Sequence, residues 1–259
     1  MKRYPFVVAS LGFAILLMSF LFKSPPVKVY LIGDSTVADY SMEKDYMEKK
    51  YPITGWGQVF QPFLSSDSLP KLRKLIKGDS AIVIDKAKGG RSTKTFFNEG
   101  RWKEVLDSLK KNDLVLIQFG HNDGAKDRPE RFVDIPGYKD YLRMYVKDTR
   151  AKGAIPVLLT PVARNSPWKD GKLLNSHTDY PQAVKDVAKE LKVKMIDLNA
   201  LSAEFFTKKG KDFSARNYFM NLDSGKYVAY PKGQKDNTHF QPAGAREIAK
   251  IVFEALKKI

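Results

Sequence analysis

Four short polar segments contain residue types that together can perform acyl transfer. They are Gly33-Asp34-Ser35-Thr36, Gly89-Gly90-Arg91-Ser92, Gly120-His121-Asn122-Asp123 and Asp236-Asn237-Thr238-His239. Acyl transfer needs an activated hydroxyl, a base oriented by an acid, and hydrogen-bond donors directed at the developing oxyanion. Each segment alone is typical of an ordinary turn, because Gly, Ser, Asn and Asp are common turn residues. Their occurrence together in one chain favours the chemical interpretation.

The roles can be assigned from the residue types. We expect Ser35 to be the nucleophile, His239 the base, and Asp236 the acid that holds the imidazole in the useful tautomer. The expected oxyanion donors are the backbone N–H groups of Ser35 and Gly90 and the side-chain amide of Asn122. Glycine at position 90 lets the backbone approach a substrate closely, because it has no Cβ atom.

The segments must be positioned by the elements around them. Short apolar runs that predict strands lie at residues 27–32, 81–84, 114–119, 155–160 and 193–198. Apolar residues recur at helical spacing at 102–109, at 138–149 and at 245–256, the last after Pro242. This alternation predicts a parallel α/β sheet with right-handed crossovers. In such sheets the ligand site lies beyond the carboxyl ends of the strands, where three of the four polar segments begin.

The complete motif set resembles that of the SGNH (GDSL) hydrolase superfamily, and within it the rhamnogalacturonan acetylesterase-like family. The resemblance spans roughly residues 28–256. The matching segments are GDSTVA at 33–38, GWGQ at 55–58, GRSTKTF at 90–96, EGRW at 99–102, QFGHND at 118–123, TPVAR at 160–164 and DNTH at 236–239. The motifs are specific as a set.

This resemblance implies a triad of Ser35, Asp236 and His239, with an oxyanion hole formed by Ser35, Gly90 and Asn122. It also implies a flavodoxin-like three-layer α/β/α sandwich with a five-stranded parallel sheet. The implied activity is that of a serine esterase that removes O-acetyl groups from a polysaccharide, chiefly a pectic one. Relatives often carry Asn at the position of Asp85, and we expect the carboxylate here to be structural.

The sequence is also compatible with two other functions. A lipase or thioesterase that acts on another small acyl ester would use the same fold and triad, and a binding module would lack catalysis. The chain has three His, scattered along the sequence, and no H-E-x-x-H motif, so we expect no metal and no cofactor. The G-x-S-x-G elbow is also absent, and the α/β-hydrolase fold is therefore not implied.

Several residues outside the triad are candidates for substrate binding. Arg91 and Arg164 follow strand ends and are expected either to bind uronate carboxylates or to form salt bridges. Trp168 is the favoured platform for stacking a sugar, and Trp56 is a second candidate. Trp102 lies on a helical stripe and is expected in the core.

The remaining polar residues near the motifs are expected to be structural. His121 is predicted to be packed or hydrogen-bonded, and His177, in a polar loop, to lie on the surface. Asp34 and Asp123 are expected to brace their loops.

The charge of the chain indicates which polymers it can attract. The 259 residues carry a formal net charge of +16, which can steer anionic polymers toward the surface. We find no basic helix and no aromatic RNA-binding motif, so nucleic acid is not an expected partner. The expected partner is an acetylated polysaccharide, with an anionic pectin as one candidate. The sequence predicts no oligomeric state.

The N-terminus indicates export. Lys2 and Arg3 precede an uncharged apolar stretch at 5–22, which as a helix would be about 27 Å long, close to the ~30 Å hydrocarbon core. We therefore interpret residues 1–26 as a signal peptide or a membrane-contacting N-terminal anchor, and residues 27–259 as the SGNH hydrolase catalytic domain. The chain has no Cys, which excludes a lipoprotein anchor and disulfides. The expected location is periplasmic, extracellular or membrane-anchored facing outside.

Overall fold

The computed structural model describes residues 25–259. The predicted leader at 1–26 therefore lies outside the described residues, apart from its last two positions. Between residues 25 and 259 no helix has both the length and the apolar character that crossing a membrane requires.

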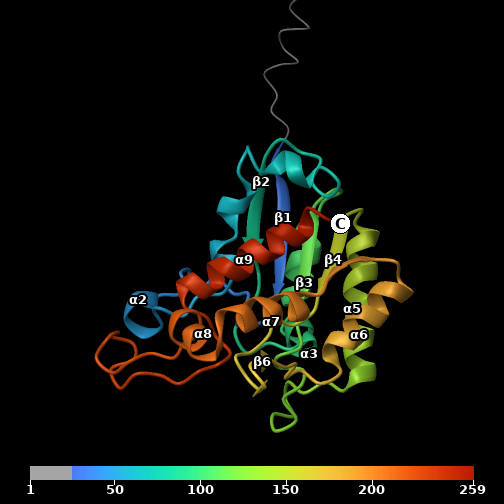
Figure 1. Cartoon of the computed structure of the whole chain (residues 1–259). Coiled ribbons are helices and arrows are strands. Elements are labelled where there is room, and N and C mark those ends of the chain that lie inside the picture. Colours follow the sequence, from blue (N-terminus) through green and yellow to red (C-terminus); the bar gives the residue numbers. More distant parts are fainter. Residues whose placement is uncertain (1–24) are drawn as a thin grey trace, which may run out of the picture.

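Five parallel strands form the central sheet, in the order β2-β1-β3-β4-β7 (Figure 1). Their bounds are Val27–Gly33 for β1, Ala81–Asp85 for β2, Leu114–Gln118 for β3, Ile155–Leu159 for β4 and Lys194–Ile196 for β7. The five-stranded parallel sheet predicted from the apolar runs is confirmed, with strand ends shifted by at most two residues. Because all five strands run in the same direction, the segments that follow them meet at one edge of the sheet.

Each face of the sheet packs against its own apolar cluster. Along β1, Val29 and Leu31 belong to one cluster, whereas Tyr30 and Ile32 belong to the other. This alternation follows from the two-residue period of a strand, which sends successive side chains to opposite faces. The strands are thus covered on both sides, as their near-continuous apolar runs predict.

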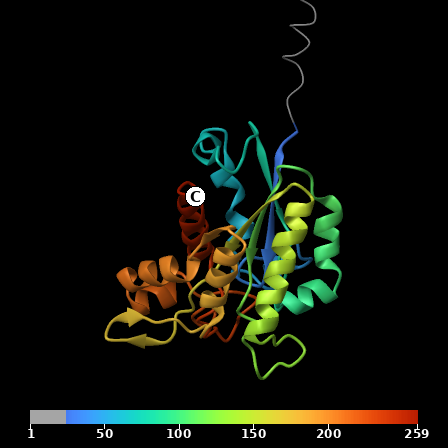
Figure 2. The same cartoon turned by 90° about the vertical axis from the view of Figure 1, so that its right-hand side faces the viewer.

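Helices form the two outer layers of the sandwich. One face is covered by α3 (Thr93–Asn98), α4 (Arg101–Ser108), α5 (Ile135–Ala151) and α6 (Tyr180–Glu190). The other face is covered by α7 (Leu198–Lys209), α9 (Pro242–Leu256) and 3₁₀ turns at Gly57–Val59, Gln61–Leu64 and Leu69–Leu72. Figure 2 shows α9, in red, on the opposite side of the sheet from α5, in yellow-green.

The three helices predicted from apolar periodicity are all present, and α9 begins at Pro242 as expected. Trp102 is fully buried, which confirms its place in the core. The sequence did not indicate α2 (Tyr46–Lys49), α8 (Lys211–Asn217) or the small hairpin of β5 (Trp168–Lys169) and β6 (Lys172–Leu173).

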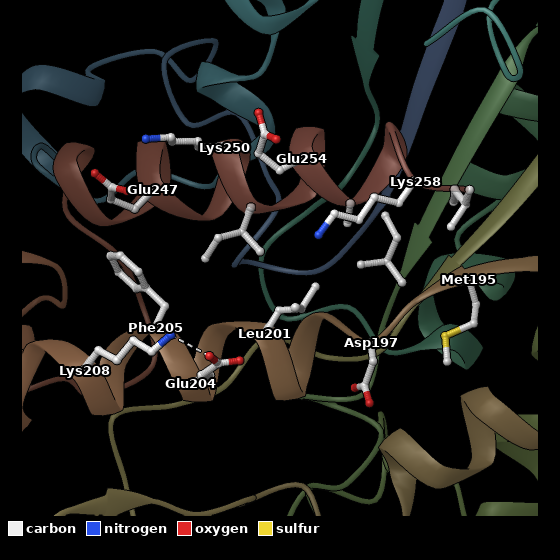
Figure 3. A pocket seen from close by; sticks show the side chains of 14 residues that line it. Met195, Asp197, Leu201, Glu204, Phe205, Lys208, Glu247, Lys250, Glu254 and Lys258 are labelled. Atoms are coloured by element: carbon white, nitrogen blue, oxygen red, sulfur yellow. Dashed lines mark hydrogen bonds and ion pairs between the residues drawn. The ribbon is translucent and has the colours of Figure 1, made fainter. Parts of the chain in front are cut away.

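A groove of about 490 Å³ lies between α7 and α9 (Figure 3). Apolar side chains such as Leu201 and Phe205 line it, and Glu204 and Lys208 pair with each other at its edge. None of the site residues predicted from the sequence lines this groove. The chemistry must therefore be sought at the carboxyl edge of the sheet.

Candidate active site

Ser35, His239 and Asp236 are in contact at the carboxyl edge of the sheet. Ser35 Oγ lies 2.9 Å from His239 Nε2, although the two residues are 204 positions apart in the sequence. His239 Nδ1 lies 2.6 Å from Asp236 Oδ2. The structure thus brings together the three residues that the sequence assigned as nucleophile, base and orienting acid.

The turn after β1 places Ser35 at this edge. The Asp34 carboxylate accepts hydrogen bonds from the backbone N–H and the hydroxyl of Thr36, at 2.9 and 2.8 Å. Gly33 is required at the strand end, because a Cβ atom there would lie 2.5 Å from the carbonyl oxygen of Gln118. The Gln118 side chain, in turn, donates to Thr36 Oγ1 at 2.7 Å. The serine is therefore held by both its own turn and the neighbouring strand β3.

The loop before α9 fixes the other two residues of the triad. Asp236 Oδ1 accepts the backbone N–H groups of Thr238 and His239, at 2.7 and 3.0 Å. Burial by itself would raise the pKa of Asp236, but its hydrogen bonds to the His239 ring and to these N–H groups hold the pKa below the ordinary value. An ionised Asp236 favours the His239 tautomer that carries its proton on Nδ1. His239 Nε2 is then free to accept the proton of Ser35.

Of the expected oxyanion donors, Gly90 and Asn122 lie on the loops that follow β2 and β3. Gly90 has a φ of +80°, a conformation that glycine adopts without steric cost. Asn122 is 9% exposed, and its Nδ2 atom donates one hydrogen bond to the backbone oxygen of Arg91 at 2.9 Å. An amide nitrogen carries two hydrogens, so one N–H of Asn122 is left for a ligand.

A hollow of about 410 Å³ opens beside Ser35 and His239. Ile53 is the one aliphatic residue among the described residues that line it. Lys50 and Lys88 lie in its wall and share the carboxylate of Glu43, at 2.5 and 2.7 Å. Because two ammonium groups share one carboxylate, this wall has an excess of positive charge.

Comparisons with known proteins identify the family. The sequence model of the family described as GDSL-like Lipase/Acylhydrolase matches residues 29–252. The chain belongs to this family. It is 40% identical to the probable rhamnogalacturonan acetylesterase YesY of Bacillus subtilis, over 89% of this chain and 93% of YesY. It is 35% identical to the rhamnogalacturonan acetylesterase RhgT of the same organism, over 90% of this chain and 91% of RhgT.

Solved structures of other proteins show the same fold. The structure of YxiM from Bacillus subtilis superposes with a TM-score of 0.71 at 25% identity, covering 90% of this chain and 57% of that longer one. The acetylxylan esterase Axe2 from Geobacillus stearothermophilus superposes with a TM-score of 0.57 at 19% identity, covering 89% of this chain and 94% of Axe2. The resemblance to the SGNH (GDSL) superfamily, with its α/β fold, is thus confirmed.

The residues suggested for substrate binding lie in different places in this GDSL-like protein. Arg91 lines the hollow beside Ser35 and pairs with Glu99 at 3.0 Å. Arg164 instead lines a second hollow of about 250 Å³. Trp168 packs against the core, with its indole N–H 3.1 Å from the backbone oxygen of Asn165, and lines neither hollow.

Two expectations about single residues were wrong. Trp56 was a candidate for stacking a sugar, but it is fully buried and its indole N–H donates to Gln118 Oε1 at 2.9 Å. His177 was expected on the surface, but it is 4% exposed, and its Nε2 lies 3.0 Å from the backbone oxygen of Val162. Burial lowers the pKa of His177 well below its ordinary value, so the ring is neutral and donates to this oxygen.

The structural roles expected of the other polar residues are confirmed. His121 is 5% exposed, with its Nδ1 atom 3.2 Å from Asp34 Oδ2. Asp123 braces its loop by accepting the backbone N–H groups of Thr93 and Gly120, at 2.9 and 3.1 Å.

Sequence reasoning missed residues that surround the site without belonging to a motif. Tyr40 donates its hydroxyl to the backbone oxygen of Ser35 at 3.0 Å, and Arg131 Nη1 lies 2.9 Å from Asn122 Oδ1. No signal in the sequence distinguished Arg131 from the other charged residues of its polar loop. Within residues 25–259, no cluster of three or more His, Cys, Asp or Glu side chains could hold a metal ion.

Proposed function

We propose that this protein is a serine esterase that removes O-acetyl groups from a polysaccharide, with a pectic substrate as the first candidate. The hydrogen-bonded series from Ser35 through His239 to Asp236, at 2.9 and 2.6 Å, is the observation that carries the proposal. The 40% identity to a probable rhamnogalacturonan acetylesterase over 89% of the chain supports the choice of acyl group and substrate.

The reaction follows from this geometry. Ser35 Oγ attacks the acetyl carbonyl carbon while His239 Nε2 takes the hydroxyl proton. The tetrahedral intermediate collapses as His239 returns a proton to the departing sugar oxygen, which leaves an acetyl group on Ser35. A water molecule, activated by His239 in the same way, then releases acetate. Asp236 stays ionised throughout and stabilises the imidazolium that forms in each step.

The oxyanion of this intermediate needs donors that are already in place. We assign this role to the backbone N–H groups of Ser35 and Gly90 and to Asn122 Nδ2. Gly90 lines the same hollow as Ser35, and Asn122 Nδ2 has one hydrogen that is not used within the protein. In related enzymes, removal of one such donor lowers kcat by a factor of about 10²–10³.

The walls of the hollow favour a polar substrate with a small acyl group. Its lining is dominated by polar and charged side chains, whereas a long acyl chain would need an extended apolar surface. Arg91 and the lysine pair Lys50 and Lys88 could bind the carboxylates of a uronate-containing chain. A lipase or thioesterase acting on another small acyl ester is the second candidate.

The first experiment is an assay of acetate release from acetylated pectin and from an aryl acetate. We expect Ser35→Ala to lower kcat by about 10⁶, which is the cost of losing the nucleophile in another serine hydrolase. Full activity in the variant would exclude Ser35 as the nucleophile. A series of aryl esters of increasing acyl length then separates the two candidates, because a maximum at acetate favours the acetylesterase and a maximum at longer chains favours the lipase.

We also propose that the protein acts outside the cytoplasm. The basic start and the apolar segment at 5–22 support this location, and a polymeric cell-wall or plant substrate would be met there. Fractionation of cells that express the full chain, followed by N-terminal sequencing of the product, tests both the location and the cleavage.

A further inference from the structure

Arg131 contacts two of the three residues proposed to form the oxyanion hole. Its Nη1 atom lies 2.9 Å from Asn122 Oδ1 and 3.5 Å from the backbone oxygen of Gly90. It lines neither the hollow beside Ser35 nor the hollow beside Arg164. Arg131 therefore contacts the proposed donors without lining either hollow.

The two hydrogen bonds of the Asn122 amide fix which way it faces. Its oxygen accepts from Arg131, whose guanidinium can only donate, and its nitrogen donates to the backbone oxygen of Arg91, which can only accept. A flipped amide would bring oxygen against oxygen and N–H against N–H. The Arg131 contact thus fixes which end of the Asn122 amide is the nitrogen, whose second N–H is the proposed oxyanion donor.

The charge of Arg131 acts in the same direction. A cation on the carbonyl oxygen of an amide withdraws electron density and makes the N–H a stronger donor, an effect that is larger in a site shielded from water. The Asn122 side chain is shielded from water in this way, since the residue is 9% exposed. The guanidinium also favours negative charge that develops nearby during the reaction.

The loop that carries Arg131 is anchored on both sides of it. Lys94, on α3, donates its ammonium to the backbone oxygens of Pro129 and Phe132, at 3.0 and 2.9 Å. The backbone N–H of Val133 donates to the oxygen of Asp123 at 3.0 Å. These contacts fix the backbone on both sides of Arg131.

We propose that Arg131 is a positioning residue that orients and polarises the Asn122 amide as an oxyanion donor. This inference rests on the proposed esterase function. Because Arg131 acts on a donor that is needed chiefly in the transition state, its removal should lower kcat and leave KM nearly unchanged.

The test compares Arg131→Met, which keeps the aliphatic stem but removes the charge and the donors, with Arg131→Lys, which keeps a cation. With an aryl acetate as substrate, we expect Arg131→Met to lower kcat by about 10- to 100-fold, somewhat less than the loss of a whole oxyanion donor. Arg131→Lys should recover part of this loss. Arg128→Met is the matched control and should keep wild-type kinetics, because Arg128 is an exposed arginine of the same loop that pairs only with Asp127.

A double-mutant cycle distinguishes positioning from a general structural effect. If Arg131 acts through Asn122, adding Arg131→Met to Asn122→Ala should cost less than about twofold in kcat. An equal cost in both backgrounds, or a change confined to KM, would overturn the proposal. Circular dichroism and Tm report whether each variant folds. If Arg131→Met does not fold, the kinetics of Arg131→Lys are compared with those of the wild type instead.

The outcome also separates this inference from the proposed function. If the wild-type protein shows no esterase activity that depends on Ser35, the proposed function fails. If that activity is present and Arg131→Met retains it in full, only the role of Arg131 is wrong.

Discussion

At the scale of single residues, the state of the Asp236 carboxylate decides how the site works. Its hydrogen bonds keep its pKa below the ordinary value, so the group is charged at every pH at which the esterase would be assayed. We expect Asp236→Asn to lower kcat on an aryl acetate by up to about 10⁴ at neutral pH, because the amide no longer enforces the productive His239 tautomer. A variant with near wild-type kcat would show that His239 is oriented by other groups.

The same carboxylate links stability to pH. Its pKa is lower in the folded than in the unfolded chain, so its contribution to stability is fully present above about pH 4 and is lost as the pH falls through the folded value. In acid titrations monitored by fluorescence, Asp236→Asn should not show the loss of stability that protonation of Asp236 causes in the wild-type protein. Identical acid transitions in the two proteins would contradict the assignment.

Residue types predicted the triad but not the burial of its neighbours. Ser35, Asp236 and His239 could be selected because few combinations of side chains perform acyl transfer. Trp56 and His177 were misplaced because their surroundings come from distant segments: Gln118 for the tryptophan and Val162 for the histidine.

At the scale of elements, the end of β2 contains a carboxyl group in an environment that is unfavourable for its charged form. Asp85 Oδ1 accepts the backbone N–H of Ala87 at 2.9 Å, but Oδ2 is inaccessible and has no hydrogen-bond partner among residues 25–259. Burial, with a smaller contribution from the charge of Asp39, raises the pKa of Asp85 well above its ordinary value. A carboxyl with a raised folded pKa supports stability below its unfolded pKa, near 4, and this support is lost as the pH rises through the folded value.

We therefore expect Asp85→Asn to stabilise the protein at pH 8, by about 1–3 kcal/mol in the free energy of unfolding. The gain should shrink as the pH falls toward 4, because the Asp85 carboxyl then becomes protonated in the unfolded chain as well. Urea denaturation at the two pH values measures the difference. Asp79→Asn is the control, because its side chain is 91% exposed, and it should change stability by less than about 0.5 kcal/mol. A gain that is equal at both pH values would contradict the prediction.

The strands were more predictable than the segments between them. Strands β1 and β3 were predictable from their near-continuous apolar runs, which occur because both faces of the sheet are covered. The hairpin of β5 and β6 has two residues per strand, too few to leave a periodic pattern. The contact between Arg131 and Asn122 arises from a polar loop folding back on itself, and residue spacing contains no information about such a contact.

At the scale of the whole molecule, the net charge of +16 should affect binding of an anionic polymer far more than binding of a neutral ester. Salt shortens the range of this attraction, from about 10 Å at 0.1 M to about 3 Å at 1 M. We expect KM for acetylated pectin to rise several-fold between 50 mM and 500 mM NaCl, whereas kcat/KM for an aryl acetate changes by less than about twofold. Equal salt effects on the two substrates would show that long-range attraction is unimportant.

The separation of 204 positions between Ser35 and His239 determines when the proposed active site can form during synthesis of the chain. Ser35 is synthesised 204 residues before His239, so a growing chain that has not yet reached His239 holds the proposed nucleophile without its proposed base. Under the proposed mechanism, hydrolysis can begin only after the loop that carries His239 has folded against the turn after β1. The proposed mechanism therefore predicts that a truncated product without α9 and the loop before it is inert toward esters, however well its remaining strands assemble.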